Sequence, residues 1–95
     1  MSEIVKETRF LAFHHEGPSE SGKTNRYTVR NKRGGETLAL VAWYGPWRCY
    51  TADFSDMATF NAECLSDIAA FLRGLTAAQV DHAATLRSLP GERAS

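Results

Sequence analysis

The spacing of apolar residues changes once along this chain, near residue 60, and that change constrains the fold most. Before it, β-branched and aromatic residues form short runs interrupted by glycine, proline and asparagine, which is typical of strands joined by turns. After it, apolar residues recur at helical spacing. We therefore predict an α+β domain in which an antiparallel sheet of about four strands is packed by one long C-terminal helix, with a second short helix.

Local connections between the predicted strands favour an antiparallel meander. Residues 14–25 are rich in turn-forming side chains and predict a long polar loop. Gly34 and Gly35 predict a hairpin turn, and Pro46 marks a second turn, where its missing N–H does little harm. The four predicted strands span residues 4–13, 26–30, 36–44 and 47–54.

The helical part of the chain is predicted as two helices, over residues 61–73 and 76–89. Asn61 is expected to cap the first helix at its N-terminus, and Gly74 to end it. Thr76, with Gln79 three residues later, is expected to begin the second through a capping box, before Pro90 stops it. The apolar stripe that should face the sheet contains Leu65, Ile68, Leu72 and Leu75, supplemented by Cys64 and Phe71.

Composition limits the chain to one small domain, predicted over residues 1–89, with residues 90–95 as a disordered tail. The 95 residues carry no net charge, and no apolar run approaches the roughly 20 residues that span a bilayer. Cys49 and Cys64 form no CxxC pair and fit a reducing compartment. We expect a cytoplasmic protein with no membrane partner, cofactor, metal site or catalytic residues, because no histidine, cysteine or acidic cluster has the required spacing.

The most recognisable motif is GPSESGKT at residues 17–24, a full match to the Walker A consensus for nucleotide binding. That mechanism needs a helix opening at the lysine and threonine, inside a parallel sheet. The following residues, NRYTVRN, alternate as a strand does and leave no room for a crossover helix of about a dozen residues. We therefore interpret the motif as a hairpin loop and keep nucleotide binding only as an alternative.

A basic stretch occupies residues 23–33, KTNRYTVRNKR, with five positive charges and no acid. It predicts either a solvated hairpin or a nucleic-acid-binding face, although the zero net charge weakens the second interpretation. The candidate nucleic-acid-binding residues are Lys23, Arg26, Arg30, Lys32 and Arg33.

Aromatic residues crowd around the predicted turn at Gly45 and Pro46 more densely than one small core requires. They either surround the rim of the core or form an exposed surface of the kind enriched at protein interfaces. The candidate partner-binding residues are Trp43, Tyr44, Trp47, Arg48 and Tyr50.

The WYGPWR turn at residues 43–48, followed by the helix CLSDIAAF at residues 64–71, resembles an uncharacterised family of small phage and prophage proteins. That resemblance implies an origin in a mobile element and no known activity. Small phage proteins of this size often bind and block a host complex, as anti-CRISPR proteins do. We expect a non-enzymatic module that binds a protein partner, an inhibitor of a host defence complex being one form of it, with nucleic-acid binding by the basic hairpin as the alternative.

Overall fold

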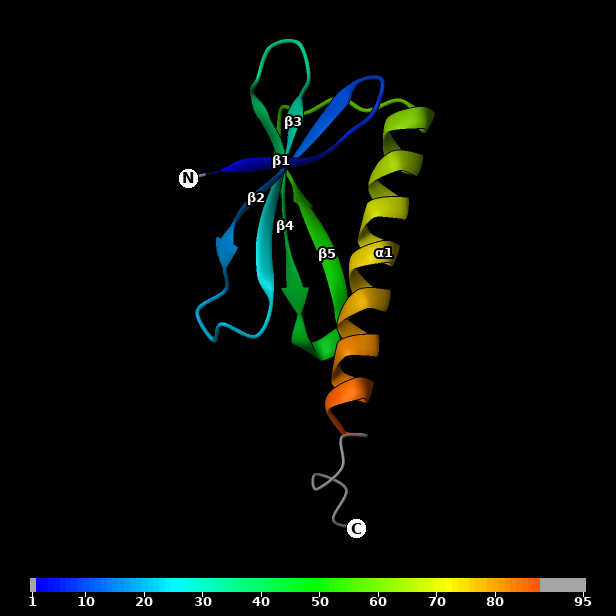
Figure 1. Ribbon diagram of the computed structural model, residues 1–95. Coiled ribbons are helices and arrows are strands. Elements are labelled where there is room, and N and C mark those ends of the chain that lie inside the picture. Colours follow the sequence, from blue (N-terminus) through cyan, green and yellow to red (C-terminus); the bar gives the residue numbers. More distant parts are fainter. Residues whose placement is uncertain (1, 88–95) are drawn as a thin grey trace.

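The computed structural model describes residues 2–87 as a five-stranded antiparallel sheet with one long helix packed against it (Figure 1). Each strand pairs with its neighbours in sequence, in the order β1-β2-β3-β4-β5, so the predicted meander is confirmed. The elements are β1 (Glu3–Glu7), β2 (Leu11–Pro18), β3 (Asn25–Asn31), β4 (Thr37–Tyr44), the short 3-10 helix η1 (Gly45–Trp47), β5 (Cys49–Phe54) and α1 (Ala62–Arg87).

The predicted first strand is two strands, which corrects the expected number from four to five. β1 ends at Glu7, and a turn closed by the Thr8 N–H, which donates to the Leu11 carbonyl at 2.9 Å, reverses the chain into β2. β2 then continues to Pro18, through the first five residues of the segment predicted as a loop. Gly17 supplies the reason: it has φ +126° at an irregularity in the β2–β3 pairing, so its conformational freedom serves a β-bulge rather than a loop.

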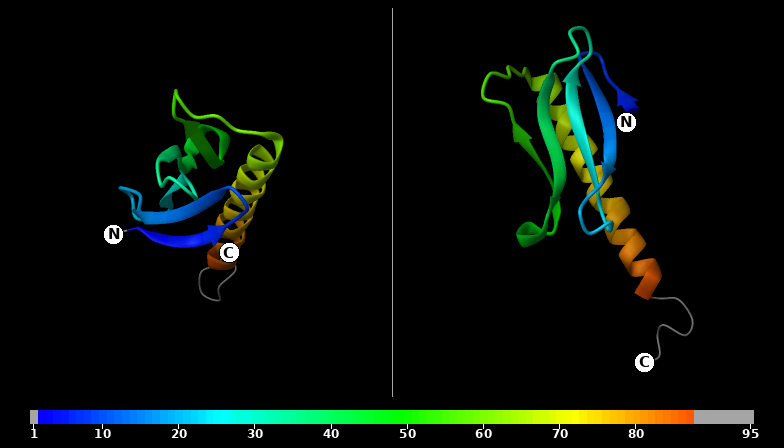
Figure 2. Two further views of the ribbon diagram at one scale, coloured as in Figure 1. Left: turned by 90° about the horizontal axis from the view of Figure 1, so that it is seen from above. Right: turned by 90° about the vertical axis from the view of Figure 1, so that its left-hand side faces the viewer.

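The core lies between α1 and one face of the sheet, and Figure 2 shows the helix along that side. Phe13 of β2 is fully buried, and its ring lies 4.4 Å, centroid to centroid, from that of Phe71 on α1. The predicted helical stripe contributes Cys64 and Ile68 to the same cluster, whereas Leu65 is exposed. The sheet contributes Leu11, Phe13, Val29, Ala39, Val41 and Tyr50.

The N-terminal cap of the helix is as predicted, but the second helix is not a separate element. Asn61 Oδ1 accepts the Cys64 N–H at 2.8 Å, as an N-cap does. α1 then continues without a break through Gly74 and Thr76 to Arg87. A glycine inside a helix costs only about 1 kcal/mol, and the Thr76 hydroxyl accepts the Tyr50 N–H at 2.9 Å instead of capping a new helix. The predicted tail at residues 90–95 lies outside the described residues.

The continuous helix predicts that Gly74→Ala stabilises the protein by about 0.5–1 kcal/mol, because alanine is the better helix former. A Cβ at position 74 would meet nothing within 4 Å, so the substitution adds no clash. Urea denaturation of the variant and the wild type measures the difference. If position 74 instead ended a helix in the left-handed conformation, alanine there would destabilise the protein.

Candidate partner-binding surface

A tight turn joins β4 to β5, and we call residues 44–48 the aromatic turn. Pro46 lies in the first turn of η1, where its fixed φ suits the helix. Arg48 ends η1 in the left-handed conformation, with φ 54°, and its N–H donates to the Tyr44 carbonyl at 2.9 Å and to the Gly45 carbonyl at 3.1 Å. Proline and these two hydrogen bonds hold the backbone of the aromatic turn in one conformation.

The turn presents two aromatic side chains to solvent. Trp47 is 72% exposed and Tyr44 is 43% exposed. Their ring centroids lie 5.1 Å apart in an edge-to-face arrangement, a favoured geometry for aromatic pairs. Arg48, next to Trp47, is exposed as well. A large apolar surface with an adjacent cation therefore stands at one end of the sheet without a partner among the described residues.

The other two predicted aromatic residues belong to the core. Tyr50 is only 5% exposed and sits opposite Trp43 in the β4–β5 pairing, with ring centroids 5.5 Å apart. The Tyr50 hydroxyl accepts the Asn25 N–H at 3.2 Å, which fixes the start of β3. The structure therefore separates the five predicted residues into Trp43 and Tyr50, which support the turn, and Tyr44, Trp47 and Arg48, which are on the surface.

The five predicted nucleic-acid-binding residues do not form one surface. Lys23 lies in the β2–β3 loop, Arg26 is exposed on the sheet, and Arg30 binds a carboxylate. Lys32 and Arg33 lie in the β3–β4 turn, at the opposite end of the sheet from the β2–β3 loop. The alternation of β3 places Arg26 and Arg30 on one face of the sheet, as predicted. Arg30 forms an ion pair with Glu16, however, so it is not a free cation of an open basic stripe.

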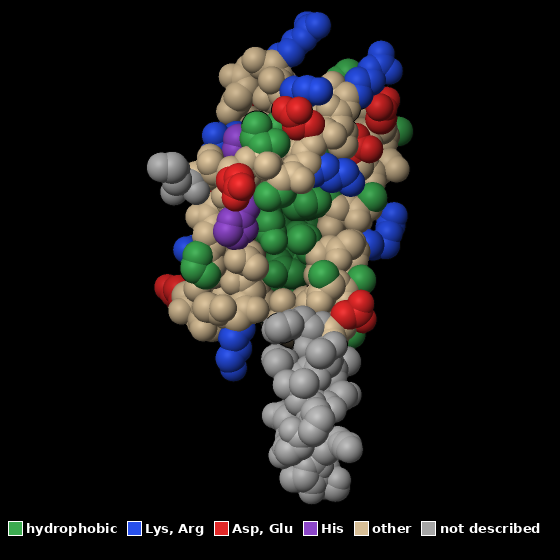
Figure 3. Space-filling model, viewed as in Figure 1, with side chains coloured by type: hydrophobic (Ala, Val, Ile, Leu, Met, Phe, Trp, Pro, Cys, Tyr) green, Lys and Arg blue, Asp and Glu red, His purple; other side chains and the backbone are tan. Residues whose placement is uncertain are grey.

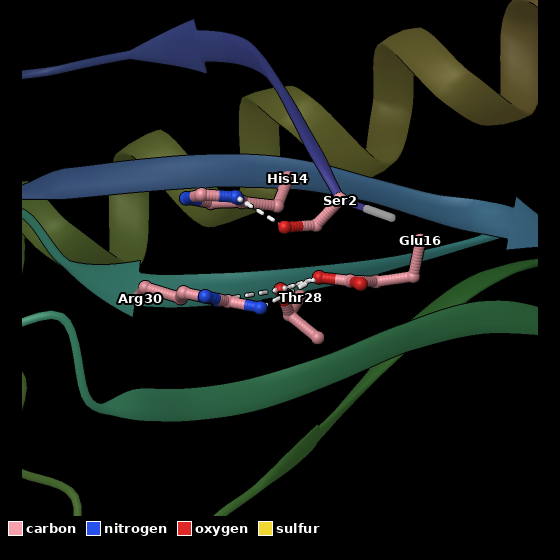
Figure 4. Close-up of polar contacts among 5 residues, drawn as sticks. All are labelled: Ser2, His14, Glu16, Thr28 and Arg30. Carbon is pink, nitrogen blue, oxygen red and sulfur yellow. Dashed lines mark hydrogen bonds and ion pairs between the residues drawn. The ribbon is translucent and has the colours of Figure 1, made fainter.

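Arg30 belongs to a polar network on the sheet face opposite α1 (Figure 4). Glu16 Oε2 accepts hydrogen bonds from the Thr28 hydroxyl at 2.7 Å and from the Arg30 guanidinium at 3.0 Å, while Arg30 Nε also donates to Thr28 at 3.2 Å. Beside this network is a shallow cavity of about 440 Å³, lined in part by Leu40 and Asp53. The Thr28 hydrogen bond and then Arg30 lower the pKa of the Glu16 carboxyl below its ordinary value near 4.5, against the opposing effect of partial burial.

This lowered pKa predicts a stability change in acid. A carboxyl group whose pKa is lower in the folded state than in the unfolded state stabilises the fold at pH values above its unfolded-state pKa. That stabilisation is lost as the pH falls through the folded-state pKa. The free energy of unfolding of the wild type should therefore exceed that of Glu16→Gln at neutral pH, with a gap that narrows below about pH 4.5. Urea denaturation across the acid range measures the gap, and a gap independent of pH would contradict the assigned network.

The Walker-like string forms a closed loop followed by a strand. The Ser19 N–H donates to the Thr24 carbonyl at 2.8 Å, the Gly22 N–H to the Ser19 carbonyl at 2.9 Å and the Lys23 N–H to Ser21 Oγ at 3.2 Å. These amides are engaged within the loop, and β3 starts at Asn25, so no helix begins at Lys23. The extended path expected after Thr24 is confirmed, and the string lacks the helix N-terminus that phosphate binding of this type requires.

Among the side chains that the structure describes, residues 2–81, no group of three or more histidine, cysteine or acidic residues is placed to hold a metal ion. Cys64 is buried in the core, Cys49 is half-buried, and neither forms a disulfide. In the same part of the chain, no helix combines the length and the apolar character needed to cross a membrane.

Fold and surface together define a small α+β protein with a helix-covered sheet and a rigid, exposed aromatic turn. The chain is 33% identical over 72 residues to the "Uncharacterized 9.3 kDa protein" of Acholeplasma phage L2, a match that covers 75% of this chain and 90% of the phage protein. The chain belongs to the family of this small phage protein. No protein-family model matches the chain, and no solved structure matches it significantly. This relative agrees with the resemblance to small phage proteins described above. That the family shares the WYGPWR turn and the CLSDIAAF helix stays a prediction.

Proposed function

We propose that this chain is a non-enzymatic module that binds another protein through the aromatic turn. Exposure of Trp47, which is 72% exposed on a rigid turn, is the observation that carries the proposal. Tryptophan, tyrosine and arginine are the residues most enriched among those that dominate binding energy at protein interfaces. The exposed part of the turn supplies one of each, as Trp47, Tyr44 and Arg48.

The rigidity of the turn supports the same function. Association costs free energy for every flexible segment that becomes ordered, so a surface that is already ordered binds more tightly for the same contacts. Two hydrogen bonds from the Arg48 N–H and the fixed φ of Pro46 order the turn before any partner arrives. Tyr44 restricts the Trp47 ring through their edge-to-face contact.

The phage family suggests which partner to test first. A phage protein meets proteins of its host and of the phage itself, so we propose that the partner belongs to one of these two groups. Inhibition of a host defence complex, as by anti-CRISPR proteins, is the form of this function that we propose to test first.

Site-specific crosslinking tests the proposal. A photoreactive phenylalanine analogue replaces Trp47 in one protein and Met57 in a control, since Met57 is even more exposed, at 90%, but lies in the β5–α1 connection. The host cells are infected by a phage that encodes a protein of this family and are then irradiated. Position 47 should form a crosslink to one defined protein, while position 57 should not. The same products from both positions, or none from position 47, would count against the aromatic turn.

A further inference from the structure

The end of the sheet away from the aromatic turn brings two turns together, namely residues 8–10, between β1 and β2, and residues 32–36, between β3 and β4. The Lys32 N–H donates to the Phe10 carbonyl at 3.0 Å, and Lys32 Nζ donates to the Thr8 carbonyl at 3.2 Å. Between the two turns lies a cavity of about 770 Å³. We call it the basic cleft; it is lined by Arg9, Phe10, Asn31, Lys32 and Arg33.

The basic cleft is positively charged. Arg9, Lys32 and Arg33 line it, and none of its lining residues is acidic. Lys32 and Arg33 form no ion pair with the described part of the chain. Arg9 approaches the Glu63 carboxylate only at 3.8 Å, with both side chains well exposed, and pairs of this kind contribute little. The three cations remain able to bind an anionic ligand, and the Glu36 carboxylate of the β3–β4 turn accepts a hydrogen bond from the lining residue Asn31 at 3.2 Å. At the top of Figure 3, Lys and Arg side chains lie among acidic ones.

An aromatic ring lies among the cations. Phe10 is 36% exposed, and the guanidinium carbon of Arg9 lies 5.0 Å from the centroid of its ring. A phenylalanine with a neighbouring arginine is a platform on which an unpaired base stacks, and stacking of this kind tolerates any base sequence. Phosphate binding alone would need only the cations, so the ring points to a ligand that carries both phosphates and planar bases.

We propose that the basic cleft binds single-stranded nucleic acid, with Arg9, Lys32 and Arg33 contacting phosphates and a base stacking on Phe10. This site is distinct from the predicted basic stripe, because it shares only Lys32 and Arg33 with that stripe and gains Arg9 and Phe10 from the other turn. It also lies at the opposite end of the sheet from the aromatic turn, so the two sites share no residue.

Fluorescence anisotropy with a labelled single-stranded oligonucleotide of about ten nucleotides tests the site. Three phosphate contacts predict a slope of about −2 in log affinity against log salt, so affinity should fall about 15- to 20-fold between about 50 and 200 mM salt. The Lys32→Ala/Arg33→Ala double variant should reduce that fall to about threefold. Phe10→Ala should weaken binding about tenfold while leaving the salt slope unchanged.

Arg73→Ala is the matched control, because Arg73 is an exposed cation on α1, far along the chain from both turns. It should bind as the wild type does, and circular dichroism confirms that each variant is folded. Wild-type affinity in folded Phe10→Ala, or no binding at about 50 mM salt, would overturn the proposal. Displacement of the oligonucleotide by pyrophosphate or polyglutamate at the same charge concentration would also overturn it, assigning the cleft to free phosphate or to acidic peptides.

Discussion

Phe13→Ala is expected to lower the free energy of unfolding by about 3–5 kcal/mol, the usual cost of removing a buried phenylalanine from a packed core. Phe13 of β2 is 0% exposed, and its ring packs against that of Phe71 on α1. This contact joins the sheet to the helix. A chain of this length has a total stability on the order of 5–14 kcal/mol, so at the lower end of that range the loss would leave part of the population unfolded. Urea denaturation followed by circular dichroism measures it.

Phe10→Ala is the matched control for that experiment, since it removes the same side chain from a position that is 36% exposed. Its cost should be well under half that of Phe13→Ala, because less apolar surface leaves the interior. Equal losses at the two positions would mean that Phe13 does not join the sheet to α1 as described.

Trp47→Ala should weaken binding of the protein partner at least about 30-fold, which corresponds to about 2 kcal/mol. The reason is that the exposed tryptophan supplies the largest apolar surface of the aromatic turn, and truncation removes it without disturbing the core. Isothermal titration calorimetry with the partner identified by crosslinking measures the affinity. The fold should be unchanged, since Trp47 contacts solvent over most of its surface.

Met57→Ala serves as the control for this substitution, because it also removes an exposed apolar side chain but from the connection between β5 and α1. It should bind the partner with the affinity of the wild type. An equal loss of affinity in both variants would indicate a diffuse apolar effect and not a site at the aromatic turn.

Most of the fold was predictable because its signals are local. Strict alternation in β3, the apolar run of β4 and the cap at Asn61 each depend on residues adjacent in sequence. The division between β1 and β2 was missed because the turn between them, residues 8–10, contains no glycine, proline or asparagine. The length of β2 was missed because it depends on pairing with β3. Strand pairing is non-local, so polarity alone made residues 14–18 look like a loop.

Two helices were predicted where the structure has the continuous helix α1, and the reason is related. Gly74 and the Thr76 capping pattern are local signals for an end and a start, yet contacts with the sheet outweigh them. Leu72 and Leu75 pack against the core on either side of Gly74, and Thr76 binds the Tyr50 backbone. Tertiary contacts of this kind exceed the small cost of a glycine within a helix.

The candidate site shows the same limit. Aromatic residues at the β4–β5 turn were found in the sequence, but only the pairing of Trp43 with Tyr50 shows which of them are core. The basic cleft was missed, because Arg9 and Lys32 are far apart in sequence and meet through the β2–β3 pairing. The signal that could have found it is the exposed Arg-Phe pair in a turn, once β1 and β2 are recognised as a hairpin.

The most direct test of the central claim is the nuclear magnetic resonance spectrum of the two tryptophan indole N–H groups, which the chain limits to Trp43 and Trp47. In the complex with saturating partner, the Trp47 signal should shift or broaden strongly, and the Trp43 signal should change much less. A Trp47 signal that stays at its free position in the saturated complex would contradict binding through the aromatic turn.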